Sequence, residues 1–248
     1  MCDHRPVLLL LVASLAAGQT PLENTGKPMR VTYECTAADT QAVGLACSAE
    51  DPCPVYLELE NIEALGNRIF LTGNLHTPTT TLYSILLESE NAGATWTEPH
   101  PRIRSSGLDQ IQFIDFQNGW ISGANLQGAP RDPFFLITTD GGKTWRQQPI
   151  FEETRVSAIE SFNFASPAHG TANIDAALDN GTHEVYETED GGNTWNIQPV
   201  AAKAKPRATS GWRIRTDAAT HSYVIEKSEN KLWQKIASFL VNIATCKE

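Results

Sequence analysis

The acidic residues are the first candidates for chemistry. A glycosidase needs two carboxylates about 5 to 10 Å apart, one to donate a proton and one to attack or to activate water. Asp109, Asp115 and Asp175 occupy strand or loop positions from which they could face a common cleft. The chain contains 29 Asp and Glu residues, so solvated turn acids are the simpler interpretation of these three. A carbohydrate-active enzyme or a sugar-binding module therefore stays as the alternative function, with no catalytic residue assigned.

The cysteines can form disulfides. Cys35, Cys47, Cys53 and Cys246 follow an export signal, and an even number of cysteines in an exported chain favours disulfides over metal ligation. Three pairings are open. We favour Cys47 with Cys53, which closes a local loop, and Cys35 with Cys246, which would tie the chain ends together.

Metal and cofactor sites are not expected. The cysteine gaps do not form paired C-x-x-C spacings, and no H-E-x-x-H sequence occurs. No glycine-rich loop joins a strand to a helix as a phosphate site requires. The histidines are scattered without the spacing of a metal pair or a catalytic dyad: His4, His76, His100, His169, His183 and His221.

The N-terminus predicts export. Residues 7–17 form an apolar run preceded by Arg5 and followed by small residues, which is typical of a signal peptide cleaved near residue 19. We expect a secreted or periplasmic protein with no membrane span in the mature chain, because no other apolar stretch approaches the required length. The net charge of −10 disfavours nucleic acid as a partner.

An eight-residue motif that ends in tryptophan occurs three times, and its tryptophans are spaced by 49 and then 50 residues. Its key positions are a hydroxyl residue, Asp or Asn, Gly, Thr and Trp. They are Ser89, Asn91, Gly93, Thr95 and Trp96 in the first copy, Thr138, Asp140, Gly142, Thr144 and Trp145 in the second, and Thr188, Asp190, Gly192, Thr194 and Trp195 in the third. A degenerate fourth copy, residues 228–233, lacks the glycines.

Each motif joins two strand-like runs and therefore predicts a hairpin turn. Glycine permits positive φ, the Asp or Asn side chain accepts hydrogen bonds from the turn, and Trp covers the junction. Further strands precede each motif, at residues 69–73, 111–123 and 159–171. Four strands per repeat of about 50 residues predict a blade of a β-propeller.

These motifs resemble the Asp-box (BNR) family, and their flanking residues resemble exported propellers related to the photosystem II stability and assembly factor. The resemblance covers about residues 58–234 and implies that Asp140 and Asp190 are structural. Sialidases, which also carry Asp boxes, use an F-R-I-P element, and Arg102-Ile103-Arg104 lacks its proline and follows the first box. The resemblance thus favours a non-catalytic scaffold that binds an exported or envelope protein of unknown identity, with a glycan as the other ligand class.

The expected architecture is all-β, a small propeller of about four four-stranded blades. We divide the chain into a signal peptide (1–19), an N-terminal segment with cysteines (20–57) and the Asp-box repeats (58–248), the last forming one domain with residues 29–57. A strand within residues 29–35 would complete the last blade, whose own strands are expected at 212–217, 222–228 and 232–241. Such closure would remove an open sheet edge.

Overall fold

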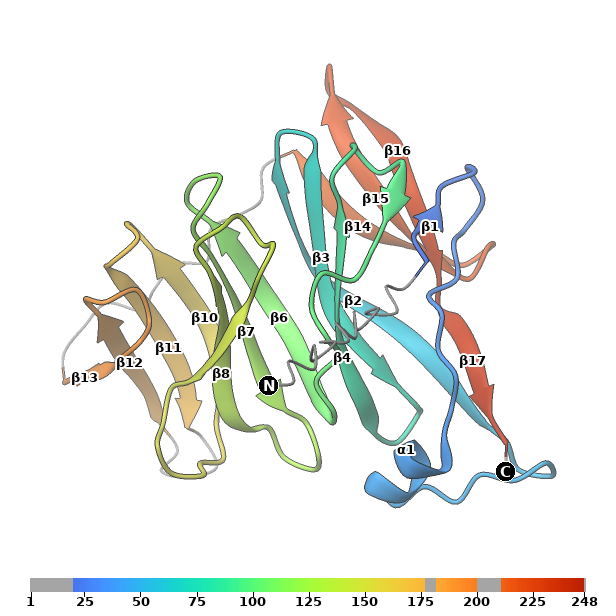
Figure 1. Ribbon diagram of the computed structural model, residues 1–248, viewed down its shortest axis with the longest axis horizontal. Helices are drawn as coiled ribbons and strands as arrows, with labels where there is room; N and C mark the ends of the chain where they lie inside the picture. Colours follow the sequence, from blue (N-terminus) through green and yellow to red (C-terminus); the bar gives the residue numbers. More distant parts are fainter. Residues whose placement is uncertain (1–19, 177–181, 200–210, 248) are drawn as a thin grey trace, which may run out of the picture.

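The computed structural model describes residues 20–176, 182–199 and 211–247, and the expected export signal lies outside them. Apart from the short helix α1 (Ala37–Ala42), the regular elements of these residues are β-strands. The strands form four antiparallel sheets that stand side by side, and a small two-stranded sheet (Figure 1). The fold is therefore nearly all-β, as expected, and its three four-stranded sheets and one three-stranded sheet are consistent with a propeller-like architecture.

Apart from β17, the strands of each of the four larger sheets follow one another in the chain and form a meander. The first contains β17 (Asn242–Cys246), β2 (Cys53–Leu65), β3 (Arg68–His76) and β4 (Thr81–Ser89). The second contains β6 (Ser106–Phe113), β7 (Gly119–Asn125), β8 (Arg131–Thr138) and β9 (Arg146–Pro149). The third contains β10 (Ala158–Phe164), β11 (Gly170–Ala176), β12 (Thr182–Thr188) and β13 (Asn196–Gln198). The fourth contains β14 (Trp212–Asp217), β15 (Ser222–Glu229) and β16 (Leu232–Leu240), and β1 (Leu22–Glu23) pairs with β5 (Thr95–Trp96). The strands expected from the repeats are all present.

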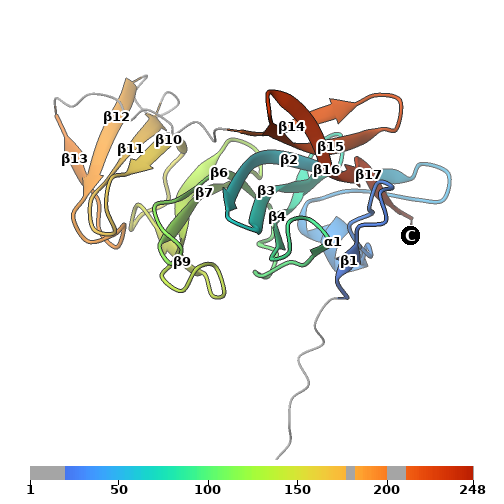
Figure 2. The same cartoon turned by 90° about the horizontal axis from the view of Figure 1, so that it is seen from above.

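The order of the sheets in space differs from their order in the chain. Seen from above, they follow one another as third, second, first and fourth (Figure 2). Strand β6 packs on the first sheet and β14 packs beside β2, which places the first sheet between the second and the fourth. The first sheet is therefore flanked by the second sheet on one side and by the fourth on the other. Side chains at its junction with β6 are in contact with strands of both the first and the second sheet.

Apolar side chains fill the junctions between the sheets. Phe70 of the first sheet stacks on Phe113 of the second, and Trp120 of the second stacks on Phe164 of the third with ring centroids 3.8 Å apart. All four side chains are buried. Alternation along each strand places these residues on one face, and burial of such large rings contributes about 1.5–3 kcal/mol each.

Glutamine side chains also join the second and third sheets. Gln112 of β6 accepts from the backbone N–H of Phe164 at 2.9 Å and donates to its carbonyl at 3.0 Å. Gln110 makes the same pair of bonds to Phe162. Each side-chain amide thus replaces a peptide group of a neighbouring strand and satisfies the backbone of the edge strand β10.

The terminal segments pair differently from the expectation. Strand β17, which was not predicted, pairs antiparallel with β2 and places Cys246 opposite Cys53. Met29 forms a single parallel bridge to Phe239 of β16, and residues 30–35 form no strand, so the predicted closing strand is not confirmed. The reason is that the chain bends at Val241, after β16, and its continuation reaches the edge of β2.

The disulfides join Cys35 to Cys246 and Cys47 to Cys53, the pairing favoured from the sequence. The first closes a separation of 211 residues and the second a separation of 6. The N-terminal segment is therefore covalently fixed to the end of β17.

Candidate functional site

The Asp-box residues form three equivalent turns, which join β4 to β5, β8 to β9 and β12 to β13, although β5 pairs with β1 and not within the first sheet. In each turn the first hydroxyl accepts from the glycine N–H four residues later, at 2.8, 2.8 and 2.9 Å for Gly93, Gly142 and Gly192. The same hydroxyl, from Ser89, Thr138 or Thr188, donates to the side chain of Asn91, Asp140 or Asp190. That side chain in turn accepts from the backbone N–H of Thr95, Thr144 or Thr194 at 2.9 to 3.0 Å.

The leading hydroxyl and the Asp or Asn side chain of each turn thus make hydrogen bonds within the turn. Hydrogen bonds from the Thr144 hydroxyl and N–H lower the pKa of Asp140 to about 2. The glycines have φ between +88° and +92°, and a Cβ on Gly142 would lie 3.0 Å from the Phe70 ring. Both the backbone conformation and the packing therefore require glycine there.

The motif tryptophans pack at the sheet junctions. Trp96 is fully buried and its indole N–H donates to Gly93, whereas Trp145 packs edge-on against Phe70 and Trp195 stacks on Phe135. Trp233, from the degenerate fourth copy, is 41% exposed, and the Arg213 guanidinium lies over its ring. The fourth copy is a plain hairpin turn between β15 and β16.

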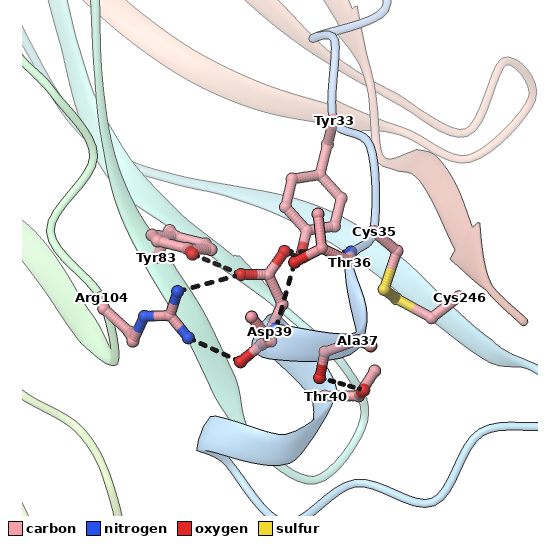
Figure 3. Close-up of polar contacts among 10 residues, drawn as sticks. Tyr33, Cys35, Thr36, Ala37, Asp39, Thr40, Tyr83, Arg104 and Cys246 are labelled. Carbon is pink, nitrogen blue, oxygen red and sulfur yellow. Dashed lines mark hydrogen bonds and ion pairs between the residues drawn. A yellow bond between two sulfur atoms is a disulfide. The ribbon is translucent and has the colours of Figure 1, made fainter. Parts of the chain in front are cut away.

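A polar cluster around Asp39 holds the N-terminal segment against β4 (Figure 3). Asp39 lies in α1 and accepts from the hydroxyls of Tyr83 and Tyr33, and Arg104 pairs with it at 3.3 Å. Burial opposes its charge, but hydrogen bonds from Tyr83 and Thr36 outweigh burial and lower the pKa of Asp39. Every charge in this cluster is matched, so the cluster fastens the segment beside the Cys35–Cys246 disulfide.

A second group of acids lies where β6 crosses the first sheet, and we name it the carboxylate cluster. It consists of Glu58 and Glu60 of β2 and Asp109 of β6. Glu60 and Asp109 both lie at register shifts, where a β-bulge redirects a side chain. Asp109 is held to the first sheet by its backbone carbonyl, which accepts from the Thr72 hydroxyl.

The cluster has unusual electrostatics. Burial, and then the charges of Glu60 and Glu58, raise the pKa of Asp109 to about 6. Burial and the charge of Glu58 also raise the pKa of Glu60, while His76 acts in the opposite direction. Tyr223 of β15 lies close enough for both glutamates to raise its pKa, although burial is the larger cause.

The other acids named as candidates lie elsewhere. Asp115 is in the turn after β6, where it accepts from the N–H groups of Gln117 and Asn118 at 2.7 Å. Asp175 of β11 lies opposite His183 of β12 in the third sheet. The structure therefore brings Asp109 together with two glutamates that sequence reasoning missed. One signal could have found the site: Glu60, Asp109 and Glu160 recur at nearly the tryptophan period, each at a register shift of the first strand in its repeat.

Within residues 20–176, 182–199 and 211–247 there is no group of three or more His, Cys, Asp or Glu side chains that could hold a metal ion. The same residues include no helix long and apolar enough to cross a membrane.

The chain is similar to several solved structures. YCF48 bound to a D1 peptide is 17% identical with a TM-score of 0.43, and the match covers 76% of this chain and 58% of that one. YCF48 from Cyanidioschyzon merolae is 14% identical with a TM-score of 0.39, covering 82% and 53%. A GH43_1 enzyme from Xanthomonas citri complexed with xylotriose is 10% identical with a TM-score of 0.38, covering 77% and 72%.

The chain thus spans a little over half the length of the two YCF48 chains. YCF48 is a photosystem II assembly factor with a β-propeller fold, so the family that the Asp boxes resemble is also present among these structures. No protein-family model and no curated protein matches the chain.

Proposed function

We propose that this chain is an exported, non-catalytic scaffold of the β-propeller type that binds another exported or envelope protein. In this proposal residues 1–19 are the export signal, residues 20–57 fasten the N-terminus, and residues 58–248 carry four blades of which the Asp boxes are structural turns. The location is the periplasm or the medium, and N-terminal sequencing of the exported protein should place the first residue near residue 20.

The carboxylate cluster is the observation that carries the proposal. Glu58, Glu60 and Asp109 are held together by two sheets, and none of them makes an ion pair with a Lys or Arg among the described residues. Keeping like charges together lowers stability, as the raised pKa of Asp109 indicates. Such a cost is typical of a binding site, where a ligand supplies the missing charge.

A glycoside hydrolase is the second candidate, because one specific observation favours it. A carboxyl with a pKa of about 6 beside two further carboxyl groups is the arrangement in which one acid donates a proton and another attacks or stabilises charge. Both candidates use the same three side chains, so they differ in whether the bound molecule is turned over.

Capture followed by a defined binding measurement tests the two candidates. The full chain, exported from its own signal and immobilised, is exposed to an envelope fraction, and each captured protein is then purified and titrated by calorimetry. A saturable one-to-one complex supports the scaffold. A panel of aryl glycosides is assayed in parallel with the wild type and with Asp109→Asn. Turnover that disappears in this variant, with no protein partner that saturates, would refute the scaffold and establish the hydrolase.

A further inference from the structure

Arginine is this chain's usual partner for a largely buried carboxylate. Five such carboxylates among the described residues each face an arginine. The pairs are Arg68 with Glu88, Arg102 with Glu98 at 2.6 Å, Arg155 with Glu184 at 2.8 Å, Arg213 with Glu226 at 2.6 Å, and Arg104 with Asp39 at 3.3 Å. A carboxylate held away from water needs a matched cation, and the planar guanidinium supplies several donors at once.

The carboxylate cluster departs from this pattern. Glu58 and Asp109 are half-buried, yet no Lys or Arg of the described chain pairs with either of them or with Glu60. The titratable groups that face the cluster are His76 of β3 and Tyr223 of β15. Within the part of the chain that the structure describes, the three carboxylates therefore have no fixed cation to match them.

A buried amide at the same place also lacks a donor. Asn74 of β3 is 5% exposed and lies opposite Glu58 in the sheet register. Its side-chain N–H₂ donates to Glu58 at 3.0 Å, which fixes the orientation of the amide because the reverse orientation would oppose two acceptors. Its Oδ1 is buried and has no hydrogen-bond partner. Asn74 also lies against β6, since a Cβ on Gly107 would be 3.9 Å from the Asn74 Cβ.

The site thus combines three carboxylates and one unpartnered carbonyl-type oxygen. All of these groups accept hydrogen bonds when the acids are ionised, and none supplies a cation. A guanidinium carries five N–H donors and one positive charge in a rigid plane, which matches acceptors that come from different strands better than the compact ammonium of lysine does.

We propose that the carboxylate cluster, together with Asn74, binds an arginine side chain presented by a partner polypeptide. This inference rests on the proposed scaffold function and specifies the chemistry of its partner. The bound guanidinium takes the place that internal arginines occupy at the five largely buried carboxylates named above. Because it favours ionised Asp109, binding should release protons near pH 6 and weaken as the pH falls below that value.

The probe for this site is a capped peptide, acetyl-Gly-Gly-Arg-Gly-Gly-amide, and its control replaces arginine by citrulline, which has nearly the same shape and no charge. Titration of the full, oxidised chain is followed by amide chemical shifts. We expect saturable shifts at residues 58–60, 74 and 107–110 with the arginine peptide and none with citrulline. Glu58→Gln and Asp109→Asn should each weaken binding about tenfold or more. Glu153→Gln removes the same charge at an exposed position outside the cluster and should leave binding unchanged.

In the peptide titration, the inference would be overturned by equal binding of the citrulline peptide, or by equal weakening in Glu153→Gln, which would indicate an effect of the overall negative charge alone. The spectra of the variants away from the cluster show whether each variant is folded. The capture experiment tests the proposed scaffold function separately from the arginine site. A captured protein that binds wild type, Glu58→Gln and Asp109→Asn equally would support the scaffold function and refute the arginine site. Binding of the arginine peptide without any captured partner would support the arginine site and refute the scaffold function.

Discussion

Replacing Asp109 by Asn should stabilise the protein at neutral pH. The native carboxyl is half-buried at the junction of β6 with the first sheet, and its charge is opposed by burial and by Glu60 and Glu58. Asparagine has nearly the same size and removes the charge. The hydrogen bond from Thr72 is retained, because it goes to the backbone carbonyl of residue 109.

The magnitude follows from the raised pKa. A pKa of about 6 in the folded state, against 3.8 for the free side chain, means that the native state binds the proton more tightly than the unfolded chain does. This contribution is fully present below about pH 4 and is lost as the pH rises through about 6. The difference of roughly two pKa units corresponds to about 3 kcal/mol at most, and we expect Asp109→Asn to recover about 1–3 kcal/mol at pH 7.5 and close to nothing at pH 4.

Urea unfolding of wild type and variant at pH 4, 5, 6 and 7.5 measures this difference directly, with the disulfides intact. Asp115→Asn is the matched control, because the pKa of Asp115 is lowered by hydrogen bonds from the Asn118 side chain and from backbone N–H groups. The same substitution there should destabilise the protein at pH 7.5. A difference for Asp109→Asn that does not grow between pH 4 and pH 7.5, or that has the sign found for Asp115→Asn, would refute the reasoning.

Three further predictions concern stability. Asp140→Ala should cost about 1 kcal/mol at pH 7 by urea unfolding. Because the folded-state pKa of about 2 lies below the ordinary 3.8, that cost should shrink as the pH falls from about 4 towards 2, and a cost independent of pH would contradict it. Replacing both cysteines of the Cys35–Cys246 disulfide by Ser should cost about 5 kcal/mol in guanidinium unfolding, against about 2 kcal/mol for the Cys47–Cys53 disulfide, because the closed loops differ so much in length. Equal costs would show that loop length is not the cause. Gln112→Ala should cost about 2 kcal/mol and speed hydrogen exchange at the Phe164 amide, whereas Gln112→Glu, which keeps the acceptor, should protect that amide better than Ala does. Exchange unchanged in both variants would refute the bridging role.

The repeat made most of the fold predictable. Period-2 alternation and the glycine-containing turns identify β4, β8 and β12, because these signals are local. The pairing of β17 with β2 was not predictable in the same way, since residues 242–246 have no motif and their partner is far away in the sequence. Helix α1 depends on the capping box of Thr36 and Asp39 and was not predicted.

The candidate site was found only in part. Asp109 was singled out for its position, but its neighbours Glu58 and Glu60 come from another sheet, and a strand pattern carries no information on which sheets pack together. The bulges at Glu60 and Asp109 depend on hydrogen-bond register, which composition and periodicity do not specify. No sequence pattern marks Asn74, because the missing donor to its side-chain oxygen is a property of the folded chain.

The position of Cys246 opposite Cys53 has a consequence for how the chain becomes oxidised. Each disulfide has one cysteine at the paired ends of β17 and β2, where Cys246 lies opposite Cys53, so these two cysteines could pair wrongly. Loop closure favours the short Cys47–Cys53 separation, which can form before β17 docks. Early oxidation of that pair removes two of the four thiols and leaves Cys35 only Cys246 to react with. Early formation of the Cys47–Cys53 disulfide therefore protects the native pairing. Refolding that begins with Cys47 blocked should trap Cys53 in a disulfide with Cys246, its neighbour across the strands.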